Sequence, residues 1–281
     1  MLIERLQLAL MHILPKNTVS RITGNFTRSR LSRPFIAAFI RYFQIDPAQA
    51  ELNLESYQSL TEFFVRKLKP GLRPVAKGND VLVSPVDGAV SELGPICDGT
   101  LIQAKGVNYS VLDLLGHDLE KARKFHQGTF LTIYLSPRDY HRIHVPVAGK
   151  VVGSTYVPGT LFPVNPFGVR AVKGLFARNE RLITYLNSIA GLVALVKVGA
   201  TIVGSVKVNY SKTATNVPRG KLERTEYKQG PVLAKGDEVG RFEFGSTVIL
   251  LFEPGRVSLS VTSGERVLMG QEIGRIVRQE I

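Results

Sequence analysis

Residues 235–252 read KGDEVGRFEFGSTVILLF. A glycine-containing turn, KGDEVGR, is followed by Gly245-Ser246-Thr247 and then by the apolar run 248–252, a pattern typical of a turn that leads into a buried strand. A flexible glycine and a nucleophilic hydroxyl therefore lie where one β segment passes into the next. This is a place where the chain could attack its own backbone.

The turn at 235–241 has a counterpart further along the chain. MGQEIGR at 269–275 repeats KGDEVGR, and PVAGKV at 146–151 repeats PVDGAV at 85–90. Glycine-containing turns between short strands can build a β-sandwich from two similar halves, although such turns also recur by chance in β proteins. The pattern is also similar to the lipoyl and biotin carrier modules, and it predicts barrel-sandwich-like repeats.

The N-terminal part of the chain has a different character. Apolar residues recur at helical spacing over 2–13, and further helices are expected from Thr18 or Ser20 to about Arg30, from Ser32 through Phe43, and over 59–69. Beyond Pro74, short β-branched runs alternate with glycine and proline, with one helical interruption at 109–125. We predict an α+β protein in which an N-terminal amphipathic helical layer, residues 1–70, precedes a β-rich body, residues 71–281.

The charge distribution indicates an anionic partner. The net charge is +13, and residues 1–45 hold seven Lys and Arg against Glu4 alone. Basic residues mixed with Phe, Leu and Ile suit a helix at a membrane interface, although an amphipathic helix packed on its own core gives the same pattern. No segment reaches the roughly 20 apolar residues that a membrane span needs. Cys97 is the only cysteine, so no disulfide can form within the chain.

Three residues besides Ser246 are candidates for chemistry. Asp87 lies in SPVDG, where an aspartate before glycine is most simply a turn residue. His141 and His144 lie three residues apart in a polar segment between two prolines, where paired histidines favour a functional role. The spacing of three also suits metal ligands, but no third ligand accompanies the pair.

These residues could form a triad, with Asp87 as orienter, His144 as base and Ser246 as nucleophile. A serine hydroxyl becomes a good nucleophile only when an imidazole takes its proton, and a carboxylate fixes the tautomer of that imidazole. Phe244 and Val248 stand where the Gly-x-Ser-x-Gly elbow of α/β-hydrolases has glycines, which argues against an ordinary lipase.

The chain resembles the proteobacterial-type phosphatidylserine decarboxylase family over most of its length. The Tyr-His-Arg-x-His and Gly-Ser-Thr segments are the most specific, and the family's usual Leu-Gly-Ser-Thr is Phe-Gly-Ser-Thr here. The resemblance is carried by TEFFVR (61–66), SPVDG (84–88), QAKG (103–106), Tyr109-Ser110, YLSPRDYHRIH (134–144), FARNER (176–181), VGAT (198–201) and GRFEFGST (240–247).

The resemblance implies a self-cleaving proenzyme. His144, backed by Asp87, would deprotonate Ser246, whose hydroxyl would attack the carbonyl of Gly245. An N-to-O acyl shift would give an ester, and β-elimination would break the chain between Gly245 and Ser246. The dehydroalanine left at 246 would lose its nitrogen as ammonia and become a covalent pyruvoyl group. That group would form a Schiff base with the amine of phosphatidylserine and draw electrons from the breaking carboxylate bond, giving phosphatidylethanolamine. His141 would help to move the proton, and neither metal nor pyridoxal phosphate would be needed.

The resemblance also implies partners and a location. Phosphatidylserine and an anionic membrane surface would be the partners, on the cytoplasmic face of a bacterial cell membrane, with no nucleic acid. The pieces 1–245 and 246–281 would stay associated, and a homodimer is left open. Two alternatives remain from the residues alone: a serine hydrolase that uses Asp87, His144 and Ser246, and a non-catalytic lipoyl-like module that binds lipid.

Overall fold

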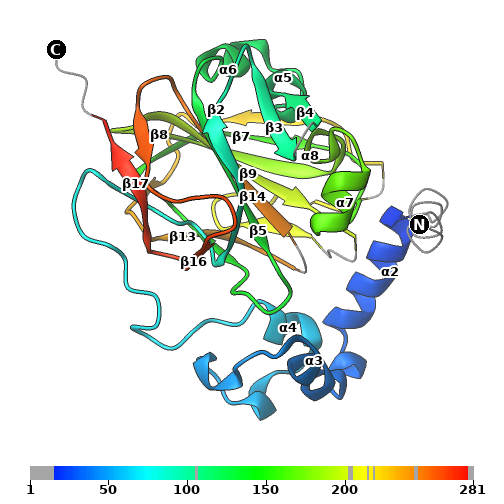
Figure 1. The fold of residues 1–281 in the computed structure, drawn as a ribbon. Coiled ribbons are helices and arrows are strands. Elements are labelled where there is room, and N and C mark those ends of the chain that lie inside the picture. The colour runs from blue at the N-terminus through cyan, green and yellow to red at the C-terminus, as the bar shows by residue number, and fades with distance from the viewer. Residues whose placement is uncertain are drawn as a thin grey trace.

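The structure is a computed structural model that describes residues 16–104, 107–201, 205–213, 215–217, 219–243 and 246–277. It contains an N-terminal helical layer followed by a β-rich body, as predicted (Figure 1). The helix expected over 2–13 lies outside the described residues, as does Gly245.

The helical layer has its own small core. Ile36, Tyr57, Phe63 and Phe64 are buried together in it, and the layer lies below the sheets while its first helix runs up one side of the body (Figure 1). Its helices are α2 (Lys16–Arg28), η1 (Arg30–Ser32), α3 (Phe35–Phe43), η2 (Pro47–Gln49), η3 (Leu54–Ser56) and α4 (Leu60–Phe64).

The fourth helix starts as predicted and ends early. The Ser59 side chain accepts a hydrogen bond from the Glu62 backbone N–H at 3.2 Å, which is an N-cap. The expectation that this helix continues to 69 is wrong. It stops at Phe64, and the carbonyl of Val65 accepts a hydrogen bond from Arg142 Nε of the body at 2.9 Å.

The centre of the body is a large antiparallel sheet. Its strands run in the order β11-β7-β8-β9-β14-β5-β2-β16, with β12 also paired to β7. The strands are β2 (Gly88–Pro95), β5 (Thr129–Leu135), β7 (Gly149–Val157), β8 (Arg181–Ser188), β9 (Gly191–Gly199), β11 (Glu223–Glu226), β12 (Val232–Leu233), β14 (Ser246–Phe252) and β16 (Arg266–Val267).

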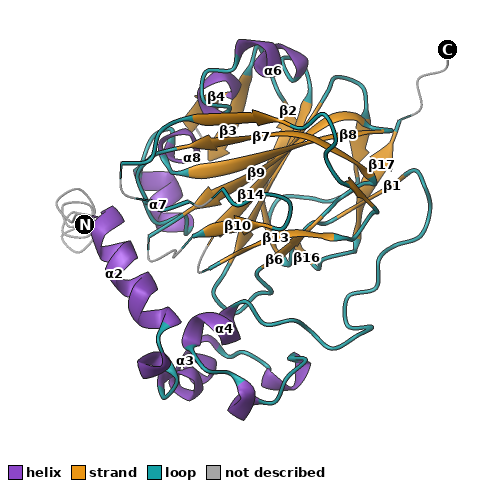
Figure 2. Cartoon of the chain, turned by 180° about the vertical axis from the view of Figure 1, so that it is seen from behind, coloured by secondary structure: helices purple, strands orange, loops and turns teal. Residues whose placement is uncertain are grey.

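Each face of this sheet is covered by different elements. One face packs against two small sheets, β1-β17-β15 and β10-β13-β6, and the other packs against short helices and the β3-β4 hairpin (Figure 2). The covering elements are β1 (Val81–Val83), β3 (Thr100–Ala104), β4 (Val107–Ser110), α5 (Val111–Leu114), α6 (Leu119–Lys124), β6 (Arg142–His144), α7 (Pro166–Ala171), α8 (Leu175–Arg178), β10 (Val206–Val208), β13 (Glu238–Phe242), β15 (Val257–Leu259) and β17 (Glu272–Ile276). No sheet closes into a barrel within the described ranges.

The repeated segments occupy equivalent places in this body. The first copy, 85–90, leads into β2, which pairs with β16, while the second copy, 146–151, leads into β7, which pairs with β12. In the same way β1 pairs with β17, and β6 pairs with β13, with the register shift at the corresponding step. The body is therefore built from two similar halves, and β14 and β9 lie side by side at the centre.

Candidate active site

Ser246 begins β14, the central strand of the large sheet. It lies directly opposite Leu135 of β5 on one side and Gly199 of β9 on the other. Alternation along a strand places its side chain on the same face as Val248, which packs against the two small sheets. The residue is fully buried, and its Oγ has no hydrogen-bond partner among the described residues. A buried hydroxyl without a partner is costly unless a reactant or a moving group uses it.

His141 comes just before β6, in the small sheet that covers this face. Its Nδ1 lies 2.8 Å from the carbonyl of Asp139, so Nδ1 carries the proton and Nε2 carries the lone pair. Nε2 is buried and has no partner in the described part of the chain. The Phe64 ring packs on the imidazole with centroids 4.0 Å apart. Burial lowers the pKa of His141 to about 3, so the ring is neutral at physiological pH.

His144 ends β6 and has a partner on each ring nitrogen. Nδ1 lies 2.7 Å from the carbonyl of Gly236 and therefore donates to it. Nε2 then accepts from the Tyr140 hydroxyl at 3.1 Å. Burial lowers the pKa of this imidazole as well. His144 is thus held as the neutral tautomer with its lone pair on Nε2.

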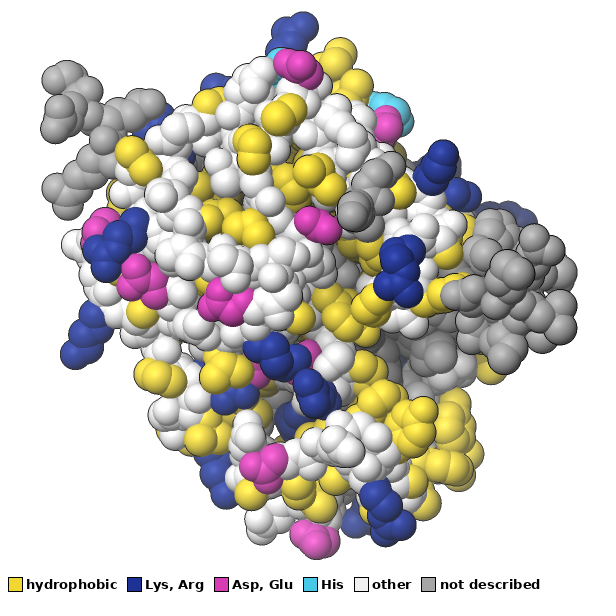
Figure 3. Space-filling model, in the orientation of Figure 1, with side chains coloured by type: hydrophobic (Ala, Val, Ile, Leu, Met, Phe, Trp, Pro, Cys, Tyr) yellow, Lys and Arg dark blue, Asp and Glu magenta, His cyan; other side chains and the backbone are white. Residues whose placement is uncertain are grey.

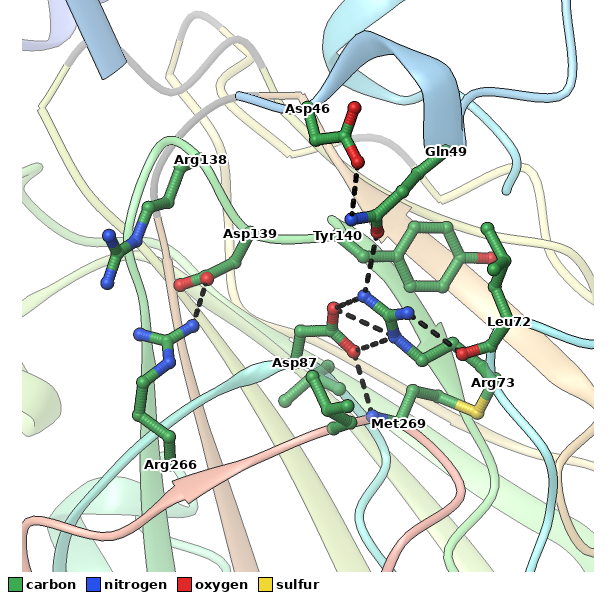
Figure 4. Close-up of polar contacts among 12 residues, drawn as sticks. Asp46, Gln49, Leu72, Arg73, Asp87, Arg138, Asp139, Tyr140, Arg266 and Met269 are labelled. Carbon is green, nitrogen blue, oxygen red and sulfur yellow. Dashed lines mark hydrogen bonds and ion pairs between the residues drawn. The ribbon is translucent and has the colours of Figure 1, made fainter. Parts of the chain in front are cut away.

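The Asp87 carboxylate is buried and fully engaged (Figure 4). Its Oδ1 lies 2.9 Å from Arg73 Nε and accepts from the Met269 backbone N–H at 2.8 Å, and its Oδ2 lies 2.5 Å from Arg73 Nη2. The hydrogen bond to Asp87 raises the pKa of Arg73. Asp87 is therefore ion-paired with a guanidinium from the linker that precedes β1.

The predicted triad residues lie in one region, but they do not hydrogen-bond to each other here. The His144 backbone N–H donates to the Pro85 carbonyl at 2.8 Å, two residues from Asp87. Among the described residues, Asp87 has Arg73 and Met269 as partners, His144 has Gly236 and Tyr140, and the Ser246 hydroxyl has none. The roles of Asp87, His141, His144 and Ser246 remain predictions.

Sequence reasoning missed a group that anchors the chain just before Gly245. Glu243 is buried and binds Arg28 of α2 at 2.8 Å, Lys207 at 2.7 Å and the Ser205 hydroxyl at 2.9 Å. Burial alone would raise the pKa of Glu243, but the bonds to Lys207 and Arg28 outweigh it and lower the pKa. The contact to Arg28 ties the helical layer to the segment that enters β14, and nothing in the local sequence indicates that pairing.

Tyr140 and Arg73 were also missed. Arg73 is 14 residues from its partner Asp87, whereas Tyr140 is four residues from its partner His144, inside the YHRIH segment that the sequence had marked. Within the described ranges, no group of three or more His, Cys, Asp or Glu side chains could hold a metal ion. Ser246, His141 and His144 are all buried.

The comparisons with known proteins identify the family. The family model for phosphatidylserine decarboxylase matches residues 60–275. The chain is 50% identical to the phosphatidylserine decarboxylase proenzyme of Brevibacillus brevis over 273 residues, covering 96% of this chain and 98% of that one. It is 48% identical over 279 residues to the proenzyme of Anaeromyxobacter sp., with coverage of 96% and 98%. For the proenzyme of Shewanella amazonensis the identity is 47% over 257 residues, with coverage of 89% and 90%.

The site therefore belongs to a decarboxylase that is made as a proenzyme. The chain belongs to the phosphatidylserine decarboxylase family.

Proposed function

We propose that this chain converts phosphatidylserine to phosphatidylethanolamine after cutting itself between Gly245 and Ser246. The observation that supports it best is the Ser246 hydroxyl, which is buried without a partner among the described residues at the start of the central strand. The matching relatives are all named as proenzymes, which fits a chain that must be cut before it works.

In the cleavage step, His144 takes the proton of Ser246 through Nε2. The bond from Nδ1–H to the Gly236 carbonyl fixes the ring in the tautomer that leaves Nε2 free to accept a proton. Tyr140 must give up its bond to Nε2 for this step. Burial lowers the pKa of His144, and the negative charge of Asp87 offsets a small part of this lowering, which favours the imidazolium that forms.

The cofactor would be a pyruvoyl group formed from Ser246 itself. Such a group acts as an electron sink when a carboxylate leaves the carbon next to a bound amine. The surroundings of Ser246 fit it, since they are dry and the Oγ position has no competing partner in the described part of the chain. His141 Nε2, buried and unpartnered in the same sense, is the group proposed to hold and return the proton.

The two pieces would stay together because their strands are interleaved. Residues 246–281 supply β14, β15, β16 and β17, and of these β14, β16 and β17 pair with β5 and β9, with β2 and with β1. Cleavage of the peptide bond between Gly245 and Ser246, just before β14, would leave the backbone hydrogen bonds of all these strand pairs intact. We propose 71–281 as the catalytic domain and 1–70 as the membrane-associating region.

The surface of the helical layer supports a membrane role. Large apolar side chains are exposed on it, and Figure 3 shows hydrophobic side chains gathered over this part of the molecule, with Lys and Arg nearby. Five of these side chains are Ile22, Phe26, Leu31, Phe35 and Tyr42. No described helix is long and apolar enough to cross a membrane. We propose peripheral attachment to the cytoplasmic face of the cell membrane through this layer, which attracts anionic lipids at roughly 1 kcal/mol per well-placed Lys or Arg.

A denaturing gel with intact-mass analysis tests the proposal. Purified protein should give two pieces, 1–245 and 246–281, the smaller with a blocked N-terminus, and should release carbon dioxide from phosphatidylserine. The Ser246→Ala chain should stay full-length and inactive, while Ser260→Ala, a change on a serine outside the site, should be cut normally. Cleavage of Ser246→Ala would overturn the mechanism, and an uncut chain with a normal Ser246 would favour a serine hydrolase or a lipid-binding module. In a flotation assay the protein should rise with anionic vesicles and much less with neutral ones.

A further inference from the structure

A cavity of about 190 Å³ lies where the helical layer, the linker before β1 and the loop after β5 meet. Arginines and aspartates dominate its wall: Arg66, Arg73, Arg138, Arg266, Asp87 and Asp139. Figure 4 shows the Asp87–Arg73 pair and the Asp139–Arg266 pair facing each other across it. An aspartate–arginine ion pair therefore lies on each side of the cavity.

Two of the three aspartates in this wall are paired with arginines, and the wall holds four arginines against three aspartates. Asp87 is paired with Arg73 at 2.5 Å, and Asp139 is paired with Arg266 at 2.5 Å. Asp46, at the rim, accepts hydrogen bonds from Ala48 and Gln49. Arg66 and Arg138 are left without a carboxylate among the described residues, so the cavity carries surplus positive charge.

Arg66 is the unusual member of the set. The residue is 5% exposed, yet its Nε and Nη1 are buried with no hydrogen-bond partner in the described part of the chain. Nη2 donates to the Arg138 carbonyl at 3.2 Å, and the guanidinium lies 5.0 Å from the Phe63 ring. Burial lowers the pKa of Arg66, but arginine stays protonated in proteins. A buried guanidinium with two idle N–H groups is costly unless an anion completes it.

The cavity lies close to the reaction site along the chain. Leu135 is opposite Ser246, and the loop that follows Leu135 carries Arg138 and Asp139 to the cavity and ends at His141. On the other side, Arg66 is two residues from Phe64, whose ring packs on His141. Arg66, just after α4, and Arg138, in the loop after β5, therefore both lie on segments that lead to His141.

A second hollow continues from the first. It measures about 380 Å³ and shares Arg138, Asp139 and Arg266 with the first, and it is also lined by Tyr42 and Phe43 of α3. Tyr42 is 81% exposed on the apolar surface of the helical layer. An amphiphile with an anionic head could place that head in the charged cavity while its apolar part follows α3 outward.

We propose that this cavity is an oxyanion site of the phosphate class, in which Arg66 and Arg138 bind the phosphoryl oxygens. Arg66 lines this cavity and has idle N–H donors, and a guanidinium binds phosphate oxygens through charge-assisted hydrogen bonds. The phosphate can come from the headgroup of a phospholipid or from free phosphate in solution. The lipid source rests on the proposed function, whereas the anion site itself does not.

Thermal melting with inorganic phosphate tests the site without any need for activity. Phosphate should raise the Tm of the purified protein above that in chloride at equal ionic strength, because a ligand that binds only the folded state stabilises it. Arg66→Gln should lose this rise while its Tm in chloride is unchanged or higher, since an unpaired buried charge has been removed. Arg138→Gln, a change on an exposed side chain, should reduce the rise, and it carries the test if Arg66→Gln does not fold. Arg123→Gln, on the exposed side of α6, should behave like the original protein.

The lipid source is tested by kinetics. If the headgroup occupies the cavity, Arg66→Gln and Arg138→Gln should raise KM for dispersed phosphatidylserine by about tenfold or more, because a charge-assisted bond of this kind is worth that factor. Inorganic phosphate should then compete with the lipid. A phosphate-dependent Tm rise without competition would assign the site to free phosphate.

The proposal is overturned if phosphate gives no rise in Tm and the KM stays unchanged in both variants. It is also overturned if phosphate stabilises Arg66→Gln and Arg138→Gln as much as the original chain. A protein that shows the Tm rise but neither cleaves nor decarboxylates would retain the anion site and disprove the proposed function, so the two failures are distinguishable.

Discussion

The two halves of the β body share one backbone plan but carry different side chains at the site. The hydrogen bonds that join them are reciprocal: the Val83 N–H donates to the Pro146 carbonyl at 3.0 Å, and the His144 N–H donates to the Pro85 carbonyl at 2.8 Å. Val83 and His144 are equivalent positions, as are Pro85 and Pro146. The scaffold is therefore close to a two-fold arrangement in which each half supports the other.

The chemistry breaks this symmetry. Asp87 of the first half corresponds to Ala148 of the second, and His144 of the second corresponds to Val83 of the first. Each half supplies one member of the proposed triad, and Ser246 lies at the start of the central strand β14. Backbone hydrogen bonds hold the scaffold in both halves, so the side chains at equivalent positions can differ.

The largest effect is expected from removing the carboxylate of Asp87, which the second half lacks at Ala148. Asp87→Asn should slow self-cleavage by about a thousandfold or more, because a neutral amide no longer favours the imidazolium of His144. The Asn oxygen can still accept from Met269, so the fold should survive. The fraction of cut chain over time on a denaturing gel measures this. Asp80→Asn, which removes an exposed partner of Arg275, is the matched control. If Asp87→Asn is cleaved at the normal rate, Asp87 has no part in self-cleavage and serves only to bind Arg73.

Much of this plan can be predicted from the sequence, because turns and strands depend on local patterns. The repeats at 85–90 and 146–151 predict the two halves correctly, and the run 248–252 predicts the central strand. Ionic contacts between distant segments leave no local pattern, which is why Asp87–Arg73 and Arg28–Glu243 were not foreseen.

A smaller effect, on stability, is expected when alanine replaces glycine in the two equivalent turns at 235–241 and 269–275. Gly236 and Gly270 have φ of 87° and 85°, and their N–H groups donate to the carbonyls of Val145 and Ser84 at 2.9 and 3.0 Å. A Cβ on Gly236 would lie 2.5 Å from a Val75 side-chain methyl, which can move, whereas one on Gly270 would lie 2.6 Å from a Pro74 carbonyl oxygen, which cannot move easily.

Urea unfolding of the uncut Ser246→Ala chain measures the difference. Gly236→Ala should cost about 1–2 kcal/mol from backbone strain, and Gly270→Ala about 2–4 kcal/mol because the clash adds to it. Gly255→Ala, with φ of 66° and no atom within 4 Å of the added Cβ, gives the strain alone. If Gly270→Ala and Gly255→Ala lose the same unfolding free energy, the linker at Pro74 moves away from the added Cβ. The clash then costs nothing, and the turns at Gly236 and Gly270 do not differ in energy.

The smallest effect concerns pH and arises in the second half alone. The folded-state pKa of His141 is about 3, and burial also lowers that of His144, while an unfolded histidine titrates near 6.5. Between those values the unfolded chain binds more protons, so the unfolding free energy should fall as the pH falls from 6.5 toward 3. Each histidine contributes a slope of at most about 1.4 kcal/mol per pH unit.

Urea unfolding of the Ser246→Ala chain at pH 7.5, 6.5, 5.5 and 4.5 tests this. His141→Gln should show a shallower loss than its parent, by up to about 1.4 kcal/mol per pH unit below 6.5. His126→Gln, a change at an exposed residue, should leave the slope unchanged. The positions that correspond to His141 and His144 in the first half are Asp80 and Val83, which have no imidazole to bury. The loss of unfolding free energy in acid therefore measures the cost of burying two neutral imidazoles in the second half. If the slope in His141→Gln equals that of its parent, the His141 ring is hydrated and is not held as a buried base.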